Sequence, residues 1–265
     1  MIDHEFRLVT PSLKKLLFLR SKKEKILNKK IPLNFVRDVN IKKINNLYLK
    51  NANLLKKIYY RGLPINDKKF YLLQEIELQA TFSELQKNYK LNGKQIVQLP
   101  NPDYVSFKVF EKNLNYIKNL CGFEVIASWH NKNITDPAYN IFLSYVQEQK
   151  LPLCVEVDYF YKSSRDSLYF FFNLIKRFPN IKYWLPHFGC GIFLHWDIIR
   201  EICKYKPVLL SSTNNILNWS HIFKIRNFKN IPLRFATDHP FNGNSSNKIY
   251  SSWNNFFNKN EKINN

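Results

Sequence analysis

The stretch LPLCVEVDYFYKSSRDSLYFFFNLIKRFPNIKYWLPH, residues 151–187, contains the repeating unit of the fold. Residues 151–157 form an apolar run that predicts a strand, and residues 167–177 follow with the apolar spacing of a helix. Phe178-Pro179-Asn180 ends that helix, and residues 181–185 predict a second strand. A strand, a helix and a strand in this order are typical of a parallel α/β fold.

The same alternation recurs on both sides of this unit. Helical spacing is found at residues 80–89, 106–120, 135–149, 167–177, 195–204 and 219–228. Strands are predicted at residues 2–8, 70–78, 94–99, 123–129, 151–157, 181–185, 207–211 and 231–237. Of these, residues 70–78 fit a helix equally well. Eight strands with helices between them predict an α/β fold of the (β/α)₈ TIM barrel type.

We expect a single domain over residues 1–265, because 265 residues of which 45% are hydrophobic suffice for one large core. Residues 10–65 are rich in Lys, Asn and Leu, and we expect a basic helical insertion there, after the first strand. The Asn- and Ser-rich tail, residues 242–265, is expected to be partly disordered.

The chain is strongly basic. It has 41 Lys and Arg against 20 Asp and Glu, which gives a net charge of +21. Such a charge is compatible with binding to nucleic acid or to an acidic surface. The chain is also rich in Asn, Ile, Phe and Tyr, which AT-rich codons favour together with Lys, so codon bias explains much of the charge without any partner. Nucleic-acid binding is therefore kept only as a further alternative.

The sequence predicts a cytoplasmic protein without a membrane span. It has no run of about 18 apolar residues, and its N-terminus is acidic where a secretory signal would be basic and apolar. The four cysteines lack a CxxC spacing and are typical of free thiols in a reducing compartment. A homo-oligomer stays open.

Acidic residues and histidines stand at or just after the ends of three predicted strands. They are Glu156, Asp158, His187, Asp238 and His239. Acidic side chains are seldom buried without a partner. Parallel α/β folds carry their active sites at the carboxyl ends of the strands. We therefore interpret these side chains as parts of one candidate site.

Four stretches carry a likeness to a known family. They are residues 2–7 (IDHEFR), 147–156 (QEQKLPLCVE), 174–189 (LIKRFPNIKYWLPHFG) and 235–241 (FATDHPF), with a weaker match at 122–130 (GFEVIASWH). Together they resemble the amidohydrolase superfamily, in the branch of metal-dependent hydrolases and decarboxylases that includes aminocarboxymuconate semialdehyde decarboxylase. Order and spacing agree over residues 95–241 and over the first ten residues.

The resemblance implies a metal-dependent hydrolase or decarboxylase that acts on a small substrate, for which a carboxylated compound is one option. In the family, two histidines of the first strand, one of the fifth and an aspartate of the eighth hold a divalent metal. A histidine of the sixth strand acts on the metal-bound water. Matched residue by residue, His187 stands at the sixth-strand position as general acid/base. Asp238 stands at the aspartate position as metal ligand or partner.

The chain departs from the family at the three metal histidines. Glu5 and Arg7 stand at the first-strand pair, and Glu156 stands at the fifth-strand position. A guanidinium stays protonated and cannot ligate a metal. With Glu5, Glu156 and Asp238 as tentative ligands, the site is rich in carboxylates and favours magnesium or manganese over zinc.

Other interpretations stay open. Arg7 can take the electrostatic role of the metal by pairing with carboxylates in forked geometry. The result is a metal-free barrel that binds a ligand or partner, or an acid–base enzyme that uses His187. A third hypothesis is the basic nucleic-acid or acidic-surface binder. In the enzyme hypothesis, the candidate substrate-binding residues are Arg7, Asp158, His130 and His239.

Overall fold

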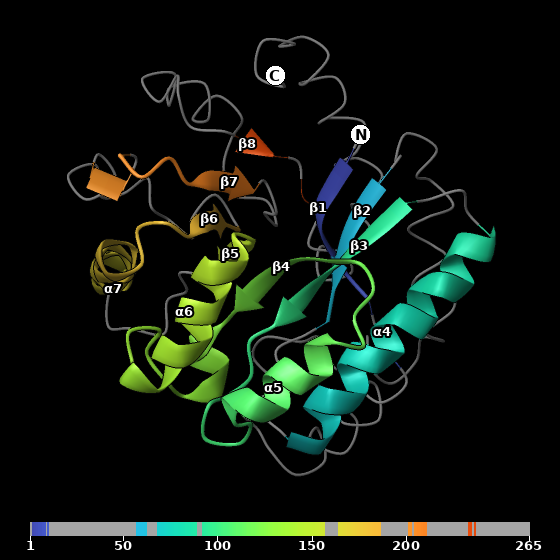
Figure 1. The fold of residues 1–265 in the computed structure, drawn as a ribbon. Helices are drawn as coiled ribbons and strands as arrows, with labels where there is room; N and C mark the ends of the chain where they lie inside the picture. Colours follow the sequence, from blue (N-terminus) through green and yellow to red (C-terminus); the bar gives the residue numbers. More distant parts are fainter. Residues whose placement is uncertain are drawn as a thin grey trace, which may run out of the picture.

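The computed structural model describes residues 2–8, 10, 57–62, 68–88, 92–156, 164–186, 201–202, 204–210, 233–234 and 236. Its sheet has eight strands, hydrogen-bonded in chain order from β1 to β8. They are β1 (Ile2–Arg7), β2 (Lys57–Arg61), β3 (Asn92–Gln98), β4 (Leu120–Val125), β5 (Pro152–Val155), β6 (Lys182–Leu185), β7 (Val208–Leu210) and β8 (Leu233–Arg234). Every neighbouring pair is parallel. The fold is a (β/α)₈ TIM barrel, as the sequence predicts (Figure 1).

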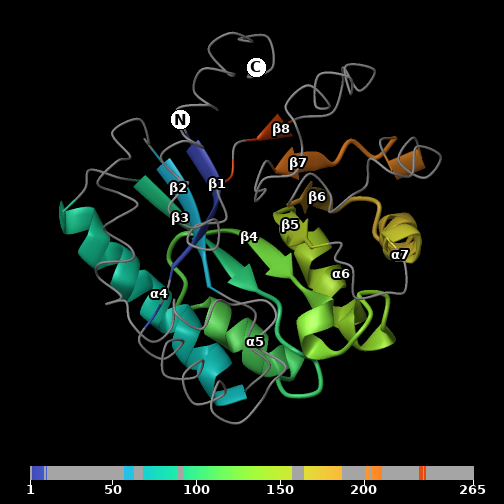
Figure 2. The same cartoon turned by 180° about the vertical axis from the view of Figure 1, so that it is seen from behind.

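Helices connect the strands and cover the outside of the barrel. They are α4 (Lys68–Asn88), α5 (Phe107–Leu114), the 3₁₀ turns η2 (Ala127–His130) and η3 (Pro137–Tyr139), α6 (Asn140–Gln149) and α7 (Ser164–Arg177). Figures 1 and 2 show α4 and α7 at opposite sides of the sheet. The described helices contain no segment long and apolar enough to cross a membrane.

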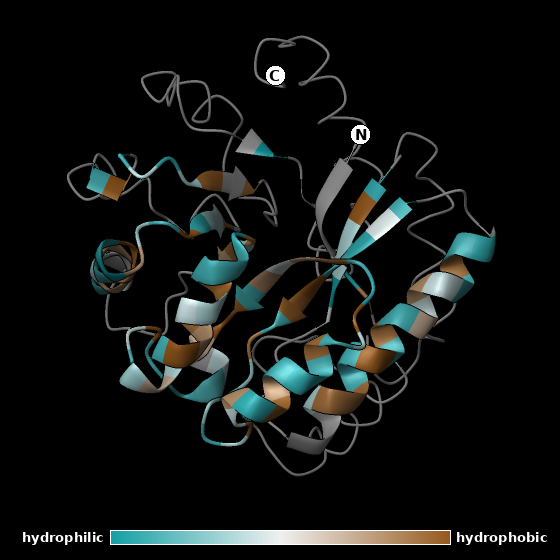
Figure 3. Cartoon of the chain, viewed as in Figure 1, coloured by the Kyte–Doolittle hydropathy of each residue, from teal (hydrophilic) through white to brown (hydrophobic). Residues whose placement is uncertain are grey.

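The main core lies between the strands and these helices. Phe123 of β4 is fully buried, and its ring lies 6.1 Å from that of Phe110 on α5. The Phe110 ring in turn lies 5.4 Å from that of Phe142 on α6, in an edge-to-face arrangement. In Figure 3 these helices carry both hydrophilic and hydrophobic residues along their length. This pattern is expected of helices with one face on a sheet and the other in water.

The second strand shows how alternation separates the two faces of the sheet. Tyr60 points outward, where its ring stacks on Phe82 of α4 at 4.4 Å. Successive side chains of a strand point to opposite faces. Tyr59 and Arg61 therefore point into the barrel. This inward row brings an aromatic ring and a charge into the interior.

The second strand differs from the one counted in the sequence. Residues 70–78, which fit a strand or a helix equally well, belong to α4, so their helical alternative is confirmed. The second strand, β2, is instead formed by Lys57–Arg61, inside the segment expected to be a helical insertion at residues 10–65. The pattern misleads because Lys57 and Arg61, charges typical of a surface, frame the apolar part of this strand. The rest of the insertion, residues 11–56 and 63–65, lies outside the described residues, as do the predicted helix 219–228 and the tail 242–265.

Candidate active site

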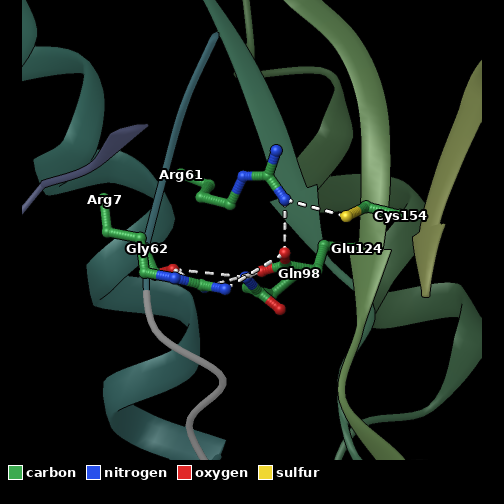
Figure 4. Close-up of polar contacts among 6 residues, drawn as sticks. All are labelled: Arg7, Arg61, Gly62, Gln98, Glu124 and Cys154. Atoms are coloured by element: carbon green, nitrogen blue, oxygen red, sulfur yellow. Dashed lines mark hydrogen bonds and ion pairs between the residues drawn. The ribbon is translucent and has the colours of Figure 1, made fainter. Parts of the chain in front are cut away.

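One side chain from each of the first five strands reaches the same level of the barrel interior. These side chains, which we call the charged layer, belong to Arg7, Arg61, Gln98, Glu124 and Cys154 (Figure 4). All but Cys154 are polar or charged, and all five are buried. A layer of this composition is unlike the branched apolar layers that usually fill such barrels.

The strand register brings the charged layer together. Arg7 is the last residue of β1 and is the register partner of Arg61, the last residue of β2. Glu124 of β4 is the register partner of both Gln98 on β3 and Cys154 on β5. The layer therefore lies at the carboxyl ends of the strands. This is the end of the barrel at which (β/α)₈ enzymes carry their active sites.

Glu124 is the centre of the charged layer. Arg7 donates with two nitrogens, from Nη1 to Oε2 at 2.8 Å and from Nη2 to Oε1 at 3.4 Å. Arg61 donates to Oε1 through Nη1, and the Gln98 amide donates to Oε2. Each carboxylate oxygen thus accepts two hydrogen bonds. The forked contact of Arg7 fixes the plane of its guanidinium as well as its position.

Three weaker contacts hold the rest of the layer. The carbonyl oxygen of Gly62, directly after β2, accepts from Arg7 Nη1 and from Gln98 Nε2, both at 3.2 Å. Arg61 Nη1 also lies 3.0 Å from the Cys154 sulfur. Both guanidiniums therefore have contacts beyond the carboxylate, which restricts their motion.

The charges of this layer are fixed at every ordinary pH. Burial alone would raise the pKa of Glu124, but the guanidiniums of Arg61 and Arg7 hold it at about 2. Glu124 is 0% exposed, and a carboxylate this deeply buried stays ionised only with such partners. The three side chains together contribute two positive charges and one negative charge.

Apolar and aromatic side chains also line the interior. Cys154 packs with the buried Leu210 and Ala236, and Trp184 of β6 packs against this group. The Trp184 ring stacks on Tyr59 of β2, with 5.7 Å between centroids. Both rings are half-buried. The interior therefore combines charged side chains with aromatic and apolar ones.

The structure describes only some of the predicted site residues. Arg7 is one of them, and its described carboxylate partner is Glu124, which we had not selected. Glu156 follows β5 directly and is half-buried, and its backbone N–H donates to the Val125 carbonyl at 3.3 Å. Glu5 lies within β1, but its side chain is outside the described part. The same holds for all of Asp158, His187, Asp238 and His239, so their roles stay predictions.

His130, a predicted substrate-binding residue, ends the 3₁₀ turn that follows β4. It is 3% exposed, and its Nδ1 lies 2.6 Å from the Tyr139 hydroxyl. Burial, with the nearby Lys132 charge, lowers the pKa of His130 to about 4, so its ring is neutral at pH 7. Its Nε2 is buried, and no described group forms a hydrogen bond with it. Whether it contacts a substrate stays a prediction.

Sequence reasoning missed four of the five members of the charged layer, Arg61, Gln98, Glu124 and Cys154. Glu124 stands in the stretch GFEVIA, where a single acid is enclosed by apolar residues. An internal strand seldom carries an acid without a partner, and this holds for Glu124 as it does for Glu156. Arg61 gave no such signal, because it was assigned to the basic insertion.

The described side chains of the charged layer do not fit a metal centre. A guanidinium cannot ligate, and both oxygens of Glu124 are already bonded to cationic or amide donors. Within the residues that the structure describes, no three His, Cys, Asp or Glu side chains gather as a metal site. The predicted ligands Glu5 and Asp238 are not among these side chains, so their assignment is untested.

Solved structures share the fold along nearly the whole chain. 5-Carboxyvanillate decarboxylase from Sphingomonas paucimobilis is 13% identical, with a TM-score of 0.68 over 94% of this chain and 91% of that one. For 2,6-dihydroxybenzoate decarboxylase in complex with 2,6-dihydroxybenzoate, the identity is 12% and the TM-score 0.64, over 94% and 92% of the chains.

A third similar structure contains a metal. It is the dihydroxybenzoic acid decarboxylase from Polaromonas sp. JS666, solved with manganese and the inhibitor 2-nitroresorcinol. It is 14% identical, with a TM-score of 0.61 over 94% of this chain and 90% of that one. No family model and no curated protein matches the sequence. At these identities the likeness establishes the fold.

Proposed function

We propose that this chain is an enzyme of the amidohydrolase kind that decarboxylates or hydrolyses a small carboxylated substrate at the carboxyl end of its barrel. The observation that carries the proposal is the charged layer. Five consecutive strands deliver polar or sulfur-bearing side chains to one level at the end where such barrels hold their substrates. A protein that needed only stability would gain little from burying three charges there.

The composition of the interior supports a small aromatic or conjugated carboxylate as the substrate class. The guanidiniums of Arg7 and Arg61 supply fixed positive charge on one side. The stacked rings of Tyr59 and Trp184 supply an apolar surface on another. Apolar walls with a few placed polar groups are the usual composition of a small-molecule site. The solved structures with the same fold include decarboxylases of hydroxybenzoates.

His187 is proposed as the group that moves the proton. It follows the last residue of β6 by two positions, and Asp238 follows Ala236, a buried residue after β8, by two positions. Both are thus expected at the barrel end that carries the charged layer. Decarboxylation of an aromatic acid needs a proton delivered to ring carbon, and hydrolysis needs one removed from water; an imidazole can perform either task.

The test is an assay of the purified chain with 2,6-dihydroxybenzoate, 5-carboxyvanillate and a panel of aromatic esters and lactones. Carbon dioxide release and the change in ultraviolet absorbance separate decarboxylation from hydrolysis. We expect His187→Asn to lower kcat by about 100-fold or more while substrate binding persists. Lys182→Ala, an exposed change on β6, is the matched control and should leave kcat unchanged. Equal turnover by wild type and His187→Asn contradicts the assignment.

A second candidate function is a barrel that binds a carboxylated ligand without turning it over. Arg7 favours it, because this arginine stands where the resembled family has a metal histidine and is paired with Glu124. The same assay separates the two functions. Saturable binding without turnover across the whole panel supports the binding protein, and turnover that needs His187 supports the enzyme.

A further inference from the structure

We infer that the Arg7 and Arg61 guanidiniums, held by Glu124, replace the divalent metal of amidohydrolase-type barrels, so that this barrel receives its anionic substrate on fixed organic cations. The part concerning the substrate rests on the proposed function. The part concerning the metal stands on the charged layer alone, so the two can fail separately.

The location of Arg7 supports this inference. It stands at the second of the two first-strand positions from which the resembled family ligates its metal, and Figure 4 shows its side chain directed at the Glu124 carboxylate. The guanidinium therefore extends from β1 to β4, past the ends of the two strands between them. A cationic group thus lies at the level of the barrel where the family places its metal ion.

The positive charges of Arg7 and Arg61 are permanent. Guanidiniums remain protonated at any pH at which the protein is folded. Arg61 is 0% exposed and Arg7 is 3% exposed, so solvent screens their charges little. A divalent cation brought to this level would face two fixed positive charges and a single carboxylate that both already contact, in a medium of low dielectric constant. That repulsion disfavours its binding.

Several hydrogen bonds hold the side chains of Arg7 and Arg61 in place. Arg7 contacts both oxygens of Glu124 and the Gly62 carbonyl, and Arg61 contacts Glu124 and the Cys154 sulfur. Gln98 braces the same carboxylate and the same carbonyl. Positive groups that are held in place before the substrate arrives stabilise its negative charge without having to reorganise. A bound metal ion stabilises negative charge in the same way.

The metal part is tested on the full chain, produced in medium supplemented with manganese and zinc. After dialysis against metal-free buffer, magnesium, manganese, iron and zinc are quantified by plasma mass spectrometry. We expect far less than one equivalent of any of them, and no rise in melting temperature when Mn²⁺ or Zn²⁺ is added alone. One tightly held equivalent that stabilises the fold and is removed only by a chelator would overturn the inference.

The substrate part is tested by calorimetric titration with 2,6-dihydroxybenzoate in the presence of EDTA. We expect wild type to bind, and Arg7→Gln to bind at least about tenfold more weakly, because one charged donor is lost. Arg177→Gln is the matched control: Arg177 is exposed on α7 and donates to the Thr135 carbonyl. Its affinity should equal that of wild type.

Two outcomes distinguish the failures. If wild type holds no metal and also binds no carboxylate, the substrate class of the proposed function is wrong while the metal replacement stands. If EDTA abolishes binding that Mn²⁺ restores, the replacement itself is wrong. Should Arg7→Gln fold poorly, Arg7→Lys serves instead: it keeps the charge, loses the fork, and is expected to be less destabilised than Arg7→Gln while still binding more weakly than wild type.

Discussion

Arg7, the last residue of β1, donates to Glu124 of β4 across 2.8 Å, although 117 positions separate the two in the chain. The contact links the first strand to the fourth across the barrel end, with Gln98 of the intervening β3 bonded to the same carboxylate. Because both partners are buried, this ion pair is the point at which the fold and the candidate site depend on each other. Its consequences can be measured.

Glu124→Gln should destabilise the fold severely. The substitution keeps the shape of the side chain but leaves two buried guanidiniums without the carboxylate that both contact. Removing one partner from a buried ion pair typically costs about 3–5 kcal/mol. The free energy of unfolding in urea measures the loss. Glu111→Gln, an exposed change on α5, is the control and should cost little. A loss of similar size in both variants would show that the charged layer does not stabilise the barrel.

The same carboxylate predicts a loss of stability in acid. The pKa of Glu124 is about 2 in the folded chain, below its ordinary value of 4.5. Between these values the unfolded chain binds more protons than the folded one, so the contribution of Glu124 is full above pH 4.5 and falls as the pH drops toward 2. The shift corresponds to about 3 kcal/mol. Comparing the unfolding free energy of wild type and Glu124→Gln from pH 6 to pH 3 measures it; parallel curves would contradict the prediction.

Glu75 predicts the opposite trend at higher pH. It is buried between α4 and the sheet, where Gln95 Nε2 donates to its Oε2 at 2.8 Å. Burial raises the pKa of Glu75 to about 8. The folded chain therefore binds more protons than the unfolded chain between pH 4.5 and 8, and stability falls as the pH rises through this window.

Glu75→Gln should remove this penalty, because the amide has nearly the same shape and no charge to bury. Its effect on stability should be small at pH 5 and favourable by roughly 3–4 kcal/mol at pH 8. Chemical denaturation at the two pH values measures the difference. The exposed Glu148→Gln is the control and should show no such dependence on pH. An equal effect of Glu75→Gln at both pH values would show that folding does not raise the pKa of Glu75 and would contradict the prediction.

Much of the fold could be predicted because its strands and helices carry their own periodicity. The unit from β5 through α7 to β6 has an apolar strand, an amphipathic helix ended by Pro179 and a second apolar strand, and each signal is local. β2 could not be predicted in the same way. Its inward face carries Lys57, Tyr59 and Arg61, and a charged inward face reverses the pattern by which a strand is recognised.

The candidate site was predictable only in part for a related reason. Arg7 drew attention because it departs from a family motif, and Glu156 because it interrupts an apolar strand. Arg61 and Glu124 explain each other only as a pair, and 63 positions separate them. A sequence pattern reports periodicity along one segment, whereas an ion pair across a barrel depends on the register of several strands.

Gly93→Ala should destabilise the packing of β3 against α4, on the outside of the barrel, and leave the charged layer unchanged. Gly93 lies in β3, and a Cβ at this position would overlap the ring of Phe82 on α4. Phe82 cannot easily withdraw, because it is 2% exposed and stacks on Tyr60 of β2. Overpacking of this kind costs about 1–3 kcal/mol. Combining Gly93→Ala with Phe82→Leu should recover part of the loss, since the smaller side chain makes room for the methyl group. A double-mutant cycle in urea measures the coupling, and strictly additive losses would show that the two residues do not compete for the same space.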